Sequence, residues 1–204
     1  MKKYVLLFFV FLFLSCNSKD KRPILGLTTY QQQLNASFKD ATTSPLLKKD
    51  LKNFKGLDFF PIDSSFIVEA KLTRTENAPI FEMPTTTERA PLYRAYGILD
   101  FKLQNTPFQL TLYQSLDDLK EDAYKDYLFL PFTDNTTGNE SYGAGRYMDV
   151  MLSDIKPDST VTLNFNNTYN PYCAYNEKYS CPLTPRKNHL AIEVSAGIKT
   201  FKKH

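Results

Sequence analysis

The stretch ILDFKLQNTPFQLTLY, residues 98–113, decides the fold, because apolar and polar residues alternate on both sides of a turn. Residues 99–103 and 108–112 each place an apolar side chain at every second position, as a strand with one buried face does. The QNTP sequence between them is rich in turn-forming residues. The stretch therefore predicts a β-hairpin.

The same two-residue period recurs in residues 66–72, 161–165 and 190–194. The composition agrees with this pattern: 12 prolines, 16 phenylalanines and 13 tyrosines favour strands and irregular loops over a helical bundle. Six or more short strands are expected along the chain. They predict a mainly β (α+β) fold, built as an antiparallel β-sandwich or barrel-like sheet.

Two short helices are expected at the N-terminal side of the sheet. Apolar residues recur every four positions from Tyr30 to Phe38, which predicts an amphipathic helix with one apolar stripe. Ser44 followed by Pro45 is typical of a helix N-cap and first helical residue. We expect that second helix to end near Gly56.

The N-terminus, MKKYVLLFFVFLFLSC, has two lysines before an unbroken apolar run, Val5–Leu14. This run is too short to span a bilayer as a helix and fits the core of a signal peptide. FLSC resembles a bacterial lipobox, in which signal peptidase II cuts before the cysteine and diacylglycerol is attached to its sulfur. Phe13 stands where most lipoboxes carry leucine. We therefore interpret residues 1–15 as a lipoprotein signal peptide and Cys16 as the lipidated, palmitate-bearing N-terminus, with an ordinary secretory signal as the alternative.

Residues 16–27 are expected to form a lipidated polar tether, and residues 28–204 a single globular domain. Loss of residues 1–15 leaves 23 basic against 22 acidic residues, so the mature protein has no electrostatic reason to bind nucleic acid. Asn17 is not the aspartate that retains lipoproteins at the inner membrane in enterobacteria-like systems. We expect a lipid anchor in the bacterial cell envelope, with the outer membrane favoured.

Candidate ligand-binding residues gather in YGAGRYMDV, residues 142–150, and in the segment that begins at residue 169. They are Tyr142, Gly143, Gly145, Arg146, Tyr147, Asp149, Tyr169 and Asn170. The glycines permit positive φ, and the planar fork of the arginine suits a carboxylate or phosphate. The alternative is a structural loop in which Arg146 forms an internal ion pair with Asp149, Glu140 or another acid.

YNPYCAYNEKYSCP, residues 169–182, places Cys173 and Cys181 eight positions apart. In an envelope compartment disulfides persist, and the chain can turn back on itself over this distance, so we predict a disulfide. A zinc site would need two further ligands, and only His189 and His204 are available as imidazoles, so no metal is expected. A third interpretation is a nucleophilic Cys173 with Glu140 or Glu193 as its base.

These late motifs, with KGLDFFPIDSSFIVEAKL at residues 55–72 and LFLPFTD at residues 128–134, resemble the DUF1684 family of uncharacterised bacterial proteins. The resemblance covers roughly residues 30–200. It includes YG-GRY-D at residues 142–149 and NPYCA with CP around the two cysteines. The family implies no activity and no cofactor for this chain.

Three functions follow from these observations. The preferred one is a lipid-anchored accessory module that binds a small polar ligand, a glycan or an envelope partner through the surface around residues 142–175. The alternative is a hydrolase or transferase that uses Cys173 or Glu140, with Arg146 as an anion binder. The third is an envelope protein in which these residues are purely structural. No G-x-S-x-G or H-E-x-x-H motif is present, which disfavours familiar serine hydrolases and zincins.

The lipidation hypothesis predicts that metabolic palmitate labelling marks the wild-type protein. Cys16→Ser should not be labelled and should accumulate in a soluble or unprocessed form, because the lipid acceptor is missing. Equal labelling of the two proteins would show that Cys16 does not carry the lipid.

Overall fold

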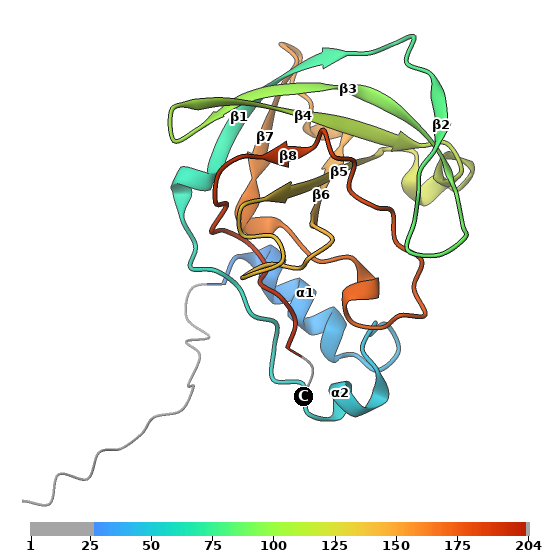
Figure 1. Ribbon diagram of the computed structural model, residues 1–204, viewed down its shortest axis with the longest axis vertical. Helices are drawn as coiled ribbons and strands as arrows, with labels where there is room; N and C mark the ends of the chain where they lie inside the picture. Colours follow the sequence, from blue (N-terminus) through green and yellow to red (C-terminus); the bar gives the residue numbers. More distant parts are fainter. Residues whose placement is uncertain (1–26, 203–204) are drawn as a thin grey trace, which may run out of the picture.

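The computed structural model describes residues 27–202, which form a strongly curved antiparallel sheet with helices at one end (Figure 1). Its strands are β1 (Ile67–Arg74), β2 (Ile80–Glu82), β3 (Leu92–Leu103), β4 (Thr106–Ser115), β5 (Tyr127–Asp134), β6 (Arg146–Met151), β7 (Thr160–Asn164) and β8 (His189–Leu190). The sheet order is β6-β5-β4-β3-β1-β7, with β2 paired to β3 and β8 paired in parallel to β5. This half-barrel confirms the predicted mainly β fold, in its barrel-like form.

The predicted hairpin is confirmed as the β3–β4 pair. Leu99 lies opposite Leu110 and Phe101 opposite Phe108, so the alternating apolar residues of the two strands face the same side. Gln104 and Asn105 form the turn with φ of 49° and 65°, a conformation that asparagine tolerates better than most residues.

A main core fills the concave side of the half-barrel. It consists of the inward side chains of β1 and β3 to β7, including Leu72, Leu99, Leu112, Leu130 and Leu163. Along β1 and β7 the core residues alternate with exposed or half-buried ones, so burial of one face fixes the register of these strands.

The weakest seam of the sheet lies between β4 and β5, which pair only at Tyr113 and Phe129. The buried side chain of Asn188 closes this seam. It accepts the Thr111 N–H at 2.9 Å and donates to the carbonyl oxygens of Thr111 at 2.8 Å and Pro131 at 2.7 Å. One amide group therefore satisfies backbone groups of both strands, which would otherwise be buried without partners.

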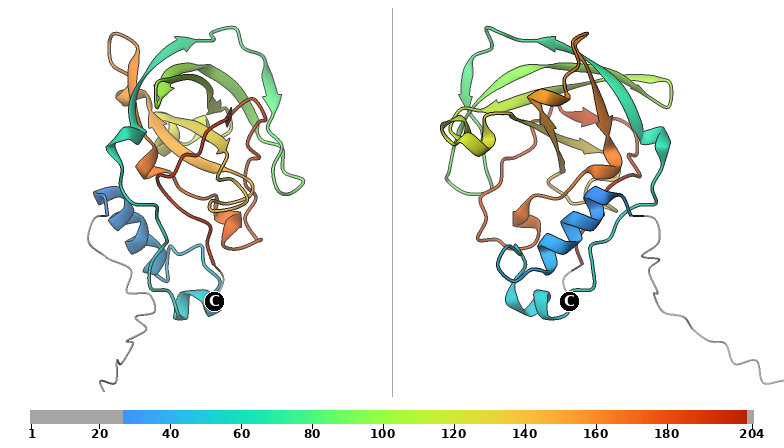
Figure 2. Two further views of the ribbon diagram at one scale, coloured as in Figure 1. Left: turned by 60° about the vertical axis from the view of Figure 1, so that its left-hand side comes forward. Right: turned by 180° about the vertical axis from the view of Figure 1, so that it is seen from behind.

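Both predicted helices are present, as α1 (Thr29–Lys39) and α2 (Lys48–Lys52), and they cover one end of the half-barrel (Figure 2). Thr28 and Gln31 form a capping box at the start of α1. The predicted start of the second helix at Ser44 and Pro45 is wrong. The Ser44 hydroxyl accepts the Leu46 N–H at 3.3 Å instead, and the chain turns to bury Leu46 before the helix begins.

Six 3₁₀ turns connect these elements in the described part of the chain: η1 (Ser64–Phe66), η2 (Asp118–Lys120), η3 (Asp122–Tyr124), η4 (Leu152–Asp154), η5 (Phe165–Asn167) and η6 (Tyr172–Ala174). Between residues 27 and 202 no helix has the length and apolarity needed to cross a membrane. The proposed signal peptide and most of the tether lie outside the described residues.

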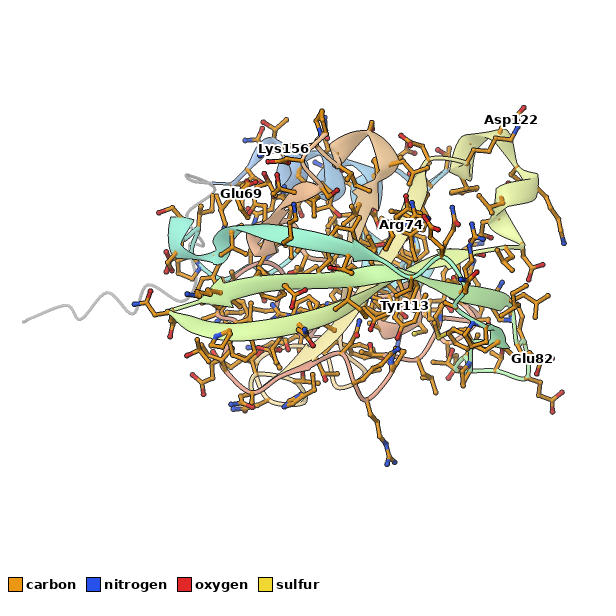
Figure 3. All side chains as sticks on the ribbon, turned by 90° about the horizontal axis from the view of Figure 1, so that it is seen from above. Glu69, Arg74, Glu82, Tyr113, Asp122 and Lys156 are labelled. Atoms are coloured by element: carbon orange, nitrogen blue, oxygen red, sulfur yellow. The ribbon has the colours of Figure 1, made fainter. Side chains whose placement is uncertain are left out.

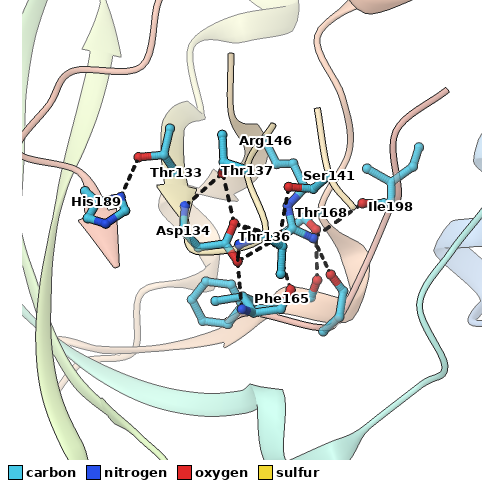
Figure 4. Close-up of polar contacts among 12 residues, drawn as sticks. Thr133, Asp134, Thr136, Thr137, Ser141, Arg146, Phe165, Thr168, His189 and Ile198 are labelled. Atoms are coloured by element: carbon cyan, nitrogen blue, oxygen red, sulfur yellow. Dashed lines mark hydrogen bonds and ion pairs between the residues drawn. The ribbon is translucent and has the colours of Figure 1, made fainter. Parts of the chain in front are cut away.

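Arg146, at the start of β6, lies in the interior (Figure 4). Its Nη2 is 3.2 Å from Oδ1 of Asp134, and both side chains are fully buried. The same guanidinium donates to the carbonyl oxygens of Val194 at 2.8 Å, Ala196 at 2.5 Å and Ile198 at 3.4 Å. Burial lowers the pKa of Arg146, and the nearby Asp134 carboxylate opposes that effect. The ion pair thus fixes the C-terminal segment to β5 and β6.

The predicted strand at residues 190–194 is largely wrong, since β8 ends at Leu190. The Val194 N–H donates to Oδ2 of Asp134 at 2.7 Å and the Val194 carbonyl accepts from Arg146. The backbone groups that a strand would use are therefore taken by the buried ion pair.

We predict that Asp134→Asn lowers the free energy of unfolding by about 3–5 kcal/mol, because it leaves the Arg146 charge buried without its partner. Urea denaturation would measure the change.

The matched control is Lys156→Met, which removes the partner of Glu69 at 2.7 Å in an ion pair on the surface (Figure 3). Because both of these side chains are half exposed, the control should unfold almost as the wild type does. Asp134→Asn with wild-type stability would show that the ion pair is not a structural clamp.

Candidate functional site

The two faces of β6 have different surroundings. Arg146, Met148 and Val150 point into the core, whereas Tyr147 and Asp149 lie on the opposite face. Tyr147 is buried there, with its ring 4.6 Å from that of Phe129 in an edge-to-face contact. Aromatic rings therefore pack on the outer face of β6, next to the polar groups of the candidate site.

The segment after β7 covers this face by pairing with β6. The Tyr147 N–H donates to the Tyr169 carbonyl at 2.9 Å, and the Tyr169 N–H donates back at 3.0 Å. The two rings are edge to face at 5.9 Å. This isolated bridge places Tyr169 beside β6, on its outer face.

Asp149 is held by two tyrosine hydroxyl groups that both donate to its Oδ1. One is Tyr127 of β5 at 3.0 Å, and the other is Tyr169. Among residues 27–202, no hydrogen bond or ion pair reaches Oδ2. The carboxylate is thus fixed in orientation with one oxygen free to take a ligand.

The surroundings of Asp149 act on the charge of its carboxyl group. Its side chain is exposed by surface area, yet the protein around it raises its pKa through desolvation. Its charge in turn contributes to the raised pKa values of Tyr30 on α1 and Tyr172 on η6. Two tyrosines therefore donate hydrogen bonds to this carboxylate, and its charge acts on two more.

Cys173 and Cys181 are adjacent but not bridged, so the structure does not contain the predicted disulfide: both are free thiols. The Cys173 N–H donates to the Cys181 sulfur at 3.1 Å. The hydroxyl of Tyr142 lies 4.0 Å from the Cys173 sulfur. The spacing correctly predicted that the two cysteines lie side by side, but proximity alone does not make a bond.

Tyr147 joins the two parts of the site. Its hydroxyl donates to the carbonyl of Pro182, directly after Cys181, while its backbone pairs with Tyr169. The site therefore combines Tyr142, Tyr147, Asp149, Tyr169, Cys173 and Cys181 on one outer face.

Three predicted site residues lie elsewhere. Arg146 is buried in its ion pair and has no face for a ligand. Asn170 is buried and donates to the Lys199 carbonyl at 2.9 Å. Glu140 pairs with the Lys199 ammonium at 3.5 Å, and no described contact joins it to Cys173. The polar character of these residues thus reflects the attachment of the C-terminal segment.

The two predicted glycines also separate. Gly143 is exposed, and a Cβ there would make only an ordinary contact with the Gly138 Cα at 3.8 Å, whereas Gly145 has a φ of +94°. A Cβ on Gly145 would lie 2.6 Å from the Phe132 carbonyl oxygen. Gly145 is therefore needed for the close approach of the loop to β5, and its N–H donates to the Tyr142 carbonyl at 3.0 Å.

Sequence reasoning missed Tyr127 and Thr86. Tyr127 is 22 residues before Asp149, and only the alternation along β5 could have placed it on the outer face. Thr86 accepts the Cys181 N–H at 3.1 Å from the β2–β3 loop, which no local pattern connects to the cysteines. Within the described chain, no group of three or more His, Cys, Asp or Glu residues is placed to hold a metal ion.

Fold and site together define a small half-barrel domain with a buried ion pair and a tyrosine–carboxylate–thiol face. The chain belongs to the DUF1684 family of proteins of unknown function, whose model matches residues 52–199. A solved structure with the same fold is that of an uncharacterised protein from gene locus rrnAC0354 of Haloarcula marismortui, which is 32% identical. The match has a TM-score of 0.66 and covers 85% of this chain and 92% of that one. No match was found among curated proteins.

We predict that Gly145→Ala lowers the free energy of unfolding by about 1–3 kcal/mol, because alanine is strained at positive φ. Gly143→Ala is the matched control two residues earlier and should have little effect. Thermal unfolding of both variants measures the difference. Equal stability of the two would show that the loop adapts without loss.

Proposed function

We propose that this protein is a lipid-anchored envelope protein whose domain binds a small ligand through a cationic group, such as an amine or ammonium, at Asp149. The observation that carries the proposal is the free Oδ2 of a carboxylate whose Oδ1 is fixed by two tyrosines. The charge of Asp149 and the tyrosines bonded to it support the same chemistry.

The charge of Asp149 favours a cationic ligand over a neutral one. Desolvation raises the pKa of this carboxyl group, which means that its surroundings disfavour the charged form. None of the ion pairs formed within residues 27–202 involves it. A ligand that brings a positive charge to Oδ2 would stabilise the carboxylate and gain a charge-assisted hydrogen bond.

The tyrosines suit the same ligand. Hydroxyl groups from Tyr127 and Tyr169 hold the carboxylate in place before any ligand arrives, which reduces the entropy lost on binding. Aromatic rings beside a carboxylate are also a common environment for ammonium groups, since ring faces attract cations. The charge of Asp149 also acts on Tyr30 and Tyr172, since it contributes to their raised pKa values.

The lipid anchor at Cys16 is part of this proposal and rests on the sequence. Residues 16–27 would span at most about 40 Å when extended, which keeps the domain close to the membrane surface. The domain would then present its site to small molecules of the envelope or to an envelope partner.

The hypothesis of a hydrolase or transferase has weaker support than the cation-binding proposal. It requires Glu140 as a base for Cys173 and Arg146 as an anion binder, but Glu140 pairs with Lys199 and Arg146 is buried. A thiol-dependent activity would have to use the groups that lie near Cys173, which are Cys181 and Tyr142.

We predict that Asp149→Asn lowers affinity for cationic probes by about tenfold or more, because the attraction of the carboxylate charge is lost and, for an amine, a charge-assisted hydrogen bond as well. Isothermal titration calorimetry with putrescine, choline and a neutral chitooligosaccharide would measure this. Binding of the cations should also weaken as pH falls through the raised pKa of Asp149, since the protonated carboxyl has no charge.

The control is Glu76→Gln, which removes an exposed acidic charge in the β1–β2 turn and should leave binding unchanged. Tyr127→Phe should weaken binding by less than Asp149→Asn does, because one of two hydroxyls still fixes Oδ1. One outcome would refute the cation site: neither putrescine nor choline binds the wild-type protein, while the chitooligosaccharide binds wild type and Asp149→Asn equally well.

A further inference from the structure

The site contains a second chemistry that the ligand proposal does not use. Cys181 is held firmly against the β2–β3 loop: its N–H donates to the Thr86 hydroxyl at 3.1 Å, and its carbonyl accepts the Thr86 N–H at 2.9 Å. The Leu183 N–H donates to the Pro84 carbonyl at 2.7 Å. Only 6% of Cys181 is exposed, so this thiol is buried and fixed.

Cys173 has a different environment. It lies in the short η6 turn after Pro171 and is half-buried, so solvent reaches it from one side. Its backbone N–H donates to the Cys181 sulfur, and the Tyr142 hydroxyl lies beside its own sulfur at 4.0 Å. The pair therefore consists of one accessible thiol in contact with one buried thiol.

We propose that Cys173 and Cys181 form a reversible dithiol–disulfide pair that exchanges with a substrate disulfide, Cys173 being the attacking thiol and Cys181 the resolving one. The Cys173 thiolate attacks one sulfur of the substrate disulfide, forms a mixed disulfide and releases the other half as a thiolate, which takes up a proton. The Cys181 thiol then loses its proton to solvent, attacks the Cys173 sulfur and releases the second half. Two protein thiols are oxidised, and one substrate disulfide is reduced to two thiols.

Electrostatics assign the two roles in the same order. The hydrogen bond from the Cys181 thiol lowers the pKa of Cys173, and the Tyr142 hydroxyl acts in the same direction. The same interaction raises the pKa of Cys181, and burial adds to this. A thiolate at Cys173 would thus exist at a pH where an ordinary cysteine is protonated, and the thiolate is the reactive form.

The main rival is a permanent disulfide that only stabilises the fold. Glutathione distinguishes the two hypotheses. An exchanging pair is oxidised by oxidised glutathione and reduced again by reduced glutathione, whereas a structural disulfide resists reduction by glutathione. The proposal is independent of the cation site, since neither thiol contacts Asp149 in the described structure.

The experiment uses the full-length chain with Cys16→Ser, so that the pair are the only two cysteines left of three. Oxidised glutathione should give a protein two hydrogens lighter and release two molecules of reduced glutathione, as mass spectrometry would show. Excess reduced glutathione should reverse the change. At pH 6, iodoacetamide should modify Cys173 about tenfold faster than it modifies free glutathione, because more of it is thiolate.

Variants in the same background separate the roles. Cys181→Ser should accumulate a glutathione adduct on Cys173, while Cys173→Ser should form none because Cys181 is buried. Circular dichroism checks that both variants fold. If one of them does not fold, the glutathione assay on the protein with both cysteines still tests the proposal. Two outcomes would overturn the proposal: a bridge that reduced glutathione cannot open, or faster modification of Cys181 than of Cys173.

Discussion

The buried ion pair between Arg146 and Asp134 is the interaction on which the rest of the structure depends. It joins the ends of two neighbouring strands to the C-terminal segment through three backbone carbonyls. Removal of two charges from water is costly, and close pairing with further hydrogen bonds offsets that cost. Loss of one partner leaves an uncompensated charge. The geometry of this end of the half-barrel is therefore tightly specified.

That constraint also shapes the candidate site on the other side of the same strand. Because side chains alternate along β6, fixing Arg146 inward directs Tyr147 and Asp149 outward. The segment after β7 then pairs with Tyr147 and delivers Tyr169 and Cys173 to the outer face. The motif at residues 142–150 is continuous in the sequence, but its residues have two different roles. Some hold the fold together, and others place free functional groups on the outer face.

The sheet was predictable where burial has a simple period. The hairpin at residues 98–113 and the strand that begins near Phe66 follow from alternation alone, since one face must leave water. Prediction was wrong at residues 190–194 and at Ser44, where local patterns were overridden by distant partners. In the first case a buried carboxylate and guanidinium use the backbone groups that a strand would have needed.

By itself the sequence determined the mainly β class, the two N-terminal helices, the family and the group of residues from which the site is built. Only the tertiary structure decided their roles. Arg146 and Asp149 are only three positions apart in the sequence. Arg146 is nevertheless buried in the core, whereas Asp149 has a free carboxylate oxygen. Likewise, spacing brought Cys173 and Cys181 together, but only the fold made one accessible and the other buried. The reason is physical: alternation specifies two faces, whereas the packing of distant segments decides which face remains open to solvent.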